Sequence, residues 1–198
     1  MPRWSRRSLV PSLVFAAALS LIGAGPTSPQ AAKPGSDAPS RGESFAAGPA
    51  ALDALQQRLG RPVEILKIVV YSESVTIEAR DPRQPTHVDS YDYSDGKLEG
   101  SEPVVVGRNQ RQLQARLFPL AAADLARLPE LLPRALAEVG AENGRVDHVT
   151  LEREERDSWV SDSTSWTRPF FRVQIIGPRS GGYVEFQLDG KRGRVVRW

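Results

Sequence analysis

Two segments of the sequence end a strand-like run in Asp-Gly-Lys, and this internal similarity limits the possible folds more than any other feature. The two segments are residues 91–97 and residues 183–191. Asp-Gly supplies the positive φ angles that a tight hairpin turn needs, so each segment predicts a strand, a turn and a returning strand. The sequence therefore predicts a chain built around antiparallel hairpins.

Further strands and one helix are predicted ahead of each hairpin. The strand candidates are residues 65–71 and 75–80 before the first hairpin, and residues 146–153 and 171–176 before the second. Leucines at three- and four-residue spacing predict amphipathic helices over residues 49–59 and 121–139. Because proline inside a helix removes a hydrogen bond, Pro129 and Pro133 predict a short turn at residues 122–126 and then a helix. That helix would begin at Pro129, and Pro133 would bend it or delay its start.

These patterns predict an α+β fold made of two tandem units, residues 49–107 and residues 108–198. Each unit would hold one helix followed by three or four antiparallel strands, with Val75, Ile77 and Ala79 pointing inward under the helix of the first unit. A unit of this size buries only a modest core, so we expect the two units to pack together. They could form one continuous sheet or a clamp with a concave side.

The first 25 residues predict a signal peptide. Arg3, Arg6 and Arg7 precede an uncharged apolar stretch at residues 9–24, and small residues follow, which is the pattern of a secretory signal. The adjacent arginines also resemble a twin-arginine export signal. Residues 26–48, rich in Pro, Gly, Ser and Ala, predict a disordered linker. We expect a periplasmic or secreted protein, with an uncleaved membrane anchor as the alternative.

Composition and charge exclude several kinds of chemistry. The chain of 198 residues has no cysteine, which excludes disulfides, thiolate metal ligands and thiol nucleophiles. Its formal charge is +2, but without the three arginines of the signal, 23 basic residues face 24 acidic ones. Because binding to nucleic acid needs an excess of positive charge, we expect no nucleic-acid partner.

The order of the predicted elements resembles a known family. A signal peptide is followed by tandem helix-then-hairpin units, in which aromatic residues precede Asp-Gly-Lys at residues 183–191 and, more weakly, at residues 91–97. This pattern over residues 49–198 is similar to secreted PepSY-like and beta-lactamase-inhibitor-like domains. The resemblance implies a non-enzymatic extracytoplasmic module that binds or inhibits another protein.

The acidic residues of the chain do not form a metal-binding motif. Asp89, Asp92 and Asp95 could suggest a calcium loop, but position 12 counted from Asp89 is Gly100 instead of the required glutamate. The acidic run at residues 152–157 is interleaved with arginines, which is typical of a solvated strand face. We therefore predict no metal site and no cofactor.

The two histidines do not complete a catalytic site. His148 follows Asp147, and a histidine–carboxylate pair can orient a general base. Adjacent residues of a regular strand point to opposite faces, however, so we expect these two side chains to diverge. A serine nucleophile would need an elbow such as Gly-x-Ser-x-Gly, which the sequence lacks. We predict no catalytic residue and no enzyme.

Residues 156–169 are the segment that suggests a binding surface. The segment separates two strands, exceeds the usual length of a hairpin loop and holds two of the four tryptophans. Aromatic side chains among small polar ones are typical of recognition surfaces. The candidate partner-binding residues are Trp159, Asp162, Trp166 and Arg168. The alternative is structural: the two strands extend, and Trp159 and Trp166 stack across them.

We therefore predict an exported, non-catalytic binding or inhibitory module with a protein or peptide partner in the cell envelope. One alternative is a hydrolase whose site carries no recognisable motif. Another is a structural envelope protein tethered by an uncleaved N-terminus, the only case in which we expect contact with the membrane.

Replacing both Trp159 and Trp166 by serine distinguishes recognition from structure. If both tryptophans bind the partner, affinity should fall well over tenfold, because an interface tryptophan can contribute more than about 2 kcal/mol. The melting temperature should then stay unchanged. If both are core residues, each replacement should cost about 3–5 kcal/mol of stability. A thermal melt of the double variant is the measurement, and a large drop would reject the recognition role.

Overall fold

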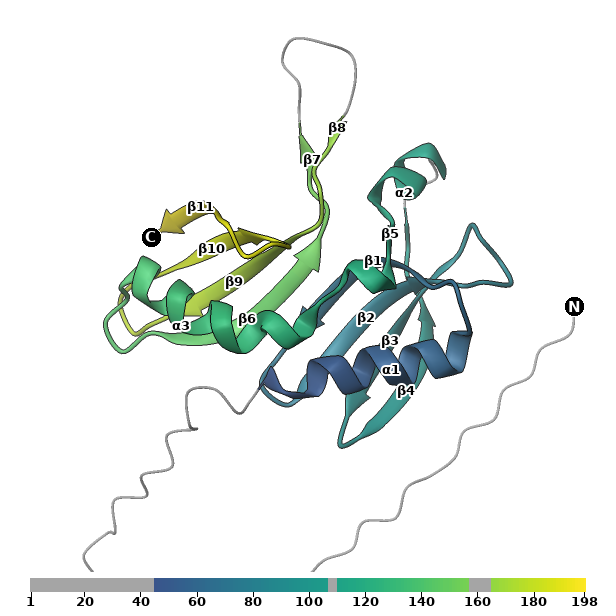
Figure 1. Ribbon diagram of the computed structural model, residues 1–198, viewed down its shortest axis with the longest axis horizontal. Helices are drawn as coiled ribbons and strands as arrows, with labels where there is room; N and C mark the ends of the chain where they lie inside the picture. The colour runs from purple at the N-terminus through teal and green to yellow at the C-terminus, as the bar shows by residue number, and fades with distance from the viewer. Residues whose placement is uncertain (1–44, 107–109, 157–164) are drawn as a thin grey trace, which may run out of the picture. The chain divides into compact units, whose positions relative to one another are not determined.

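The computed structural model describes residues 45–106, 110–156 and 165–198, which form an α+β fold (Figure 1). Its helices are α1 (Ala47–Leu59), α2 (Gln110–Arg116) and α3 (Leu128–Val139), with 3₁₀ turns η2 (Leu120–Ala122) and η3 (Leu125–Arg127). Its longer strands are β1 (Glu64–Val70), β2 (Ser74–Arg80), β3 (Val88–Ser94), β4 (Lys97–Pro103), β6 (Arg145–Glu152), β9 (Phe170–Ile176), β10 (Gly181–Gln187) and β11 (Arg192–Arg197). Its two-residue strands are β5 (Phe118–Pro119), β7 (Glu155–Arg156) and β8 (Ser165–Trp166).

The pairing of β1 with β6 makes one continuous antiparallel sheet. The strand order is β11-β10-β9-β6-β1-β2-β3-β4, and β5 pairs with the first residues of β1. In the central pair, Ile68 lies opposite Leu151 and Val70 lies opposite Val149. All four side chains are fully buried. Of the two arrangements that the sequence leaves open, the structure has the continuous sheet.

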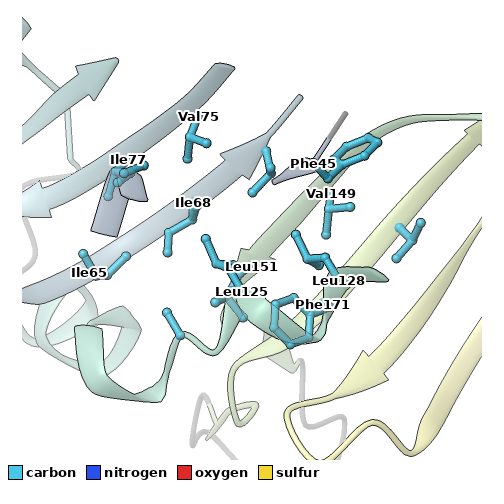
Figure 2. Packing of buried hydrophobic residues seen from close by; sticks show 14 of the residues in the cluster. Phe45, Ile65, Ile68, Val75, Ile77, Leu125, Leu128, Val149, Leu151 and Phe171 are labelled. Carbon is cyan, nitrogen blue, oxygen red and sulfur yellow. The ribbon is translucent and has the colours of Figure 1, made fainter. Parts of the chain in front are cut away.

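Both long helices pack on the same face of the sheet (Figure 1). Leu55 of α1 and Leu128 of α3 are completely buried and belong to one apolar cluster with the strands beneath them. Figure 2 shows Leu128 close to Phe171 of β9 inside this cluster. A Cβ atom on Gly48 would lie 3.0 Å from Cβ of Leu125, so glycine permits α1 to approach η3 closely.

The predicted strands and hairpins are confirmed. The four strand candidates correspond to β1, β2, β6 and β9 within one residue at each end. Both Asp-Gly pairs form turns between paired strands, β3 with β4 and β10 with β11, and Gly96 and Gly190 have φ angles of 76° and 80°. α1 begins at Ala47, inside the last residues of the expected linker, and Phe45 and Gly48 are already buried there.

The second helical region is broken as its prolines predict. The turns η2 and η3 precede α3, in which Pro129 occupies the first turn. The helix continues through Pro133, which is exposed, so the carbonyl group left without an amide donor can bond to water. Gly140 ends the helix in the left-handed conformation. No helix among the described residues has both the length and the apolar character needed to cross a membrane.

The short helix α2 packs over part of the opposite face. Leu113 of α2 joins Leu66 and Val88 in a small second apolar cluster. Leu66 reaches this face because the pairing of β1 with β2 shifts register between Ile65 and Lys67. This short helix was not predicted from the sequence, because its one buried leucine gives no helical repeat.

Replacing Leu151 by alanine should lower the free energy of unfolding by about 2–5 kcal/mol, because a cavity would remain at the β1–β6 pair. The matched control Val69→Ala changes a half-buried residue of β1 on the other face and should cost about 1 kcal/mol. Urea unfolding followed by fluorescence and by circular dichroism should give one coincident transition in each protein. Two separate transitions would show that the halves of the sheet unfold independently.

Candidate functional site

The face of the sheet opposite α1 and α3, here called the open face, carries polar and aromatic side chains. In β6, β9 and β10 these side chains alternate with the buried residues of the main cluster, as the period of a strand requires. The residues of the open face on these strands include His148, Glu152, Arg172, Gln174, Tyr183 and Glu185. They come from three neighbouring strands of one sheet.

Arg172 on β9 is the centre of a charge network on the open face. Its Nη2 atom lies 2.9 Å from Oε1 of Glu185 and 3.3 Å from Oε1 of Glu154, and its Nη1 atom lies 3.4 Å from Oε1 of Glu152. Burial alone would lower the pKa of Arg172. The hydrogen bond to Glu185 and the charges of the three glutamates outweigh burial and raise the pKa. The guanidinium therefore stays charged and holds three carboxylates together.

The alternation of charge continues across the β1–β6 pair. Lys67 on β1 lies opposite Glu152 on one side and opposite Glu78 on the other. Burial raises the pKa of Glu78, although the charges of Lys67 and Arg116 oppose this effect. The ionised form of Glu78 is thus less favourable in the folded protein than in the unfolded chain. The free energy of unfolding therefore falls as the pH rises above the ordinary pKa of a glutamate and Glu78 becomes ionised. These charges make the open face a polar surface and not an uncovered part of the core.

Two pairs of aromatic rings lie on the open face. The ring centroids of Tyr71 and His148 are 5.7 Å apart, and those of Tyr183 and Trp198 are 6.1 Å apart. Tyr71 is 43% exposed and Trp198 is 61% exposed, so each presents much of its ring to solvent. Trp198 is fixed in place because its backbone exchanges two hydrogen bonds with Gly181. A Cβ atom on Gly181 would lie 3.1 Å from Nε1 of Trp198, so a larger residue there would push the indole away.

A hollow of about 1020 Å³ lies between the start of β9, the end of β10 and β11. Two of its lining residues, Glu154 and Glu185, are partners of Arg172. Its apolar lining residues are Pro169, Phe170, Phe186 and Leu188. Its charged lining residues are Glu154, Arg168, Glu185, Asp189 and Arg194. The hollow therefore combines an apolar part with charges of both signs, as small-ligand and peptide sites do.

Cation–aromatic contacts connect the hollow to the aromatic pairs. The guanidinium of Arg172 lies 5.3 Å from the ring centroid of Phe170 and 5.0 Å from that of Tyr183. The guanidinium of Arg194 lies 5.9 Å from the ring centroid of Tyr183. These distances are within the range of cation–π attraction. Arg172, Tyr183, Arg194 and Trp198 thus form one aromatic and cationic surface beside the hollow. Phe170, which is buried in the wall of the hollow, contacts this surface through Arg172.

Of the predicted binding residues, only Arg168 can be placed by its side chain. Arg168 is exposed and lines the hollow. Trp166 lies in β8, which pairs with β7 in a separate two-stranded sheet where Trp166 is opposite Glu155. Trp159 and Asp162 lie outside the described residues, and the role of the segment in recognition stays a prediction.

The expectation that Asp147 and His148 diverge is wrong. The pairing of β6 with β9 shifts register between Val146 and His148, and such a bulge changes the directions of neighbouring side chains. Nδ1 of His148 consequently lies 2.9 Å from Oδ2 of Asp147. One sign of this bulge in the sequence is that Val146 and Val149, which both pack against the main cluster, are three positions apart and break the alternation of a regular strand.

Two of the three aspartates near the first hairpin accept a hydrogen bond from a hydroxyl group, and the third lies in the turn. Thr76 Oγ1 donates to Asp92 at 2.7 Å, and Ser101 Oγ donates to Asp89 at 3.3 Å, whereas Asp95 lies in the turn with a φ of 50°. Within residues 45–106, 110–156 and 165–198, no group of three or more His, Cys, Asp or Glu side chains is arranged to hold a metal ion.

Replacing Arg172 by methionine should lower the free energy of unfolding by about 1–3 kcal/mol at pH 7, because three glutamates lose their shared cation. At pH 4 the loss should be smaller, since protonation relieves the repulsion among them. Arg179→Met, in the exposed turn after β9, is the matched control and should stay within about 0.5 kcal/mol of the parent. Equal losses at both pH values in urea titrations would contradict the charge network.

Comparison of the chain with protein-family models, with curated proteins and with solved structures gives no match. No residue role can therefore be transferred from a relative. The function proposed below rests on the sequence and on the geometry of the open face and the hollow.

Proposed function

We propose that the protein is an exported, non-catalytic binding or inhibitory module that recognises a protein or peptide partner through its open face. The observation that carries this proposal is the surface formed by Arg172, Tyr183, Arg194 and Trp198. Tyrosine, tryptophan and arginine are the residues that contribute most to protein interfaces. Here they project from strands of a continuous sheet, so little conformational entropy would be lost when a partner binds.

The same proposal includes an origin by duplication. α1 is followed by the strands β1 to β4, and α3 is followed by β6, β9, β10 and β11, each set forming an antiparallel meander. We take residues 49–107 and 108–198 as two copies of one unit, as the resemblance to PepSY-like and beta-lactamase-inhibitor-like domains implies. Joining two copies edge to edge widens the open face beyond the part that α2 covers, which favours a macromolecular partner over a small ligand.

Export to the periplasm or beyond rests on residues 1–25, which carry the pattern of a signal peptide. N-terminal sequencing of the protein recovered outside the cytoplasm separates a cleaved signal from a retained anchor. A retained anchor would favour the alternative of a tethered structural protein of the envelope.

A second candidate is a hydrolase, and the observation that favours it is the contact between His148 and Asp147. A carboxylate within 2.9 Å of Nδ1 can orient a histidine as a general base. Replacing His148 by glutamine would abolish any hydrolysis that depends on this pair, whereas partner binding through Trp198 would persist.

The proposed function is tested by capture of a partner from cell-envelope extract on the immobilised protein. Replacing Tyr71 and Trp198 together by alanine should reduce capture at least tenfold, because two exposed aromatic contacts are lost. The melting temperature should change little, since neither residue is buried in the core: Tyr71 is 43% exposed and Trp198 is 61% exposed.

The control places the same number of changes on the other side of the sheet. Asp53 and Gln57 are exposed on α1, and Asp53→Ala with Gln57→Ala should capture as much partner as the parent protein. Loss of capture in this control, or undiminished capture by the open-face variant, would assign recognition to a different surface.

A further inference from the structure

We propose that the hollow binds an acidic side chain from an extended segment of the partner protein, and that Arg168 and Arg194 are its binding residues. This inference rests on the proposed function and names the chemistry of the partner. The inference is based on a comparison of the charged residues in the hollow: some already have a counterion within the protein, and others do not.

The carboxylates of the hollow are already paired within the protein. Glu185 and Glu154 lie 2.9 Å and 3.3 Å from Arg172. Asp189 accepts the backbone N–H of Lys191 at 2.9 Å and lies 3.2 Å from its ammonium group. The backbone N–H and the ammonium group of Lys191 lower the pKa of Asp189, which therefore stays ionised and paired. Each of these three anions therefore already has a cation of the protein within 3.3 Å.

The two arginines of the hollow differ from the carboxylates. Arg168 precedes β9 and Arg194 lies on β11, and both are exposed at the same hollow. Among the residues that the structure describes, neither guanidinium has a carboxylate within ion-pair distance, and Arg194 only lies over the ring of Tyr183. A guanidinium binds a carboxylate through two parallel N–H donors. Arg168 and Arg194 are thus the charged lining residues without an ion-pair partner in the described part of the chain, and they suit an acidic side chain.

The apolar lining and the position of the hollow favour a protein segment over a small anion. Phe170 and Pro169 are buried at its wall, and Leu188 is half-buried, so residues next to the acidic one can pack on an apolar surface. Gly193 and Arg194 belong to β11, which ends the order of strands in the sheet. An extended segment can pair with the backbone of such an edge strand and place alternate side chains into the hollow.

The test uses the full mature protein and a fluorescently labelled, C-amidated hexapeptide, Leu-Glu-Phe-Glu-Leu-Gly, with Leu-Gln-Phe-Gln-Leu-Gly as its neutral match. Fluorescence anisotropy at low salt should show the glutamate peptide binding at least tenfold more tightly than the glutamine peptide. Arg168→Gln with Arg194→Gln should reduce binding of the glutamate peptide at least tenfold and leave the glutamine peptide unaffected. Arg179→Gln removes an exposed arginine outside the hollow and should leave both unaffected.

Equal binding of the two peptides, or equal effects of the Arg179 variant and the double variant, would overturn the inference. Displacement of the peptide by an equal concentration of inorganic phosphate would also overturn it, because the hollow would then select a small anion.

The capture experiment separates this failure from failure of the proposed function. If the double arginine variant captures the envelope partner as well as the parent does, while the Tyr71 and Trp198 variant does not, only the acidic specificity is wrong. If the Tyr71 and Trp198 variant still captures the partner, the open-face function itself is wrong.

Discussion

The pairing of β1 with β6 is the interaction on which the rest of the structure depends. On the helix-covered face it brings Ile68 against Leu151, so the apolar residues beneath α1 and α3 become one cluster instead of two small ones. On the other face it brings Lys67 against Glu152 and lets the charge network around Arg172 reach the first half of the sheet. A single backbone ladder thus provides both the stability of the core and the width of the open face.

Local signals in the sequence were sufficient for most of the elements. Asp-Gly pairs, alternating apolar residues and helix-ending glycines act through residues that are neighbours in the chain, so β1, β2, β6, β9 and both hairpins were predicted. The β1–β6 pair joins residues about eighty positions apart, and no local pattern encodes such a partner. The register shift at His148 was missed for a related reason, since a bulge depends on the pairing of two strands.

The candidate site shows the same limit. The sequence directed attention to residues 156–169, where aromatic side chains are concentrated, and from that segment Arg168 does line the hollow. The remaining residues of the surface, such as Tyr183 and Trp198, are single aromatic residues within or just after strands. The registers of β10 with β9 and with β11 bring them together with Arg172 and Arg194. Their clustering is a property of the folded sheet.

The two edges of the sheet have different chemistry, and this difference bears on stoichiometry. β4, at one edge, carries Glu99 and Glu102 and ends at Pro103, which are features that discourage a further strand from adding. β11, at the opposite edge, has no proline and carries Arg192, Arg194 and Arg197, whose positive charges discourage a basic strand but attract an acidic one. A sheet that can be extended at one edge alone accepts one added strand and then stops. Strand addition at β11 would therefore give a complex of one partner per molecule, and copies of the protein could not join edge to edge into a filament.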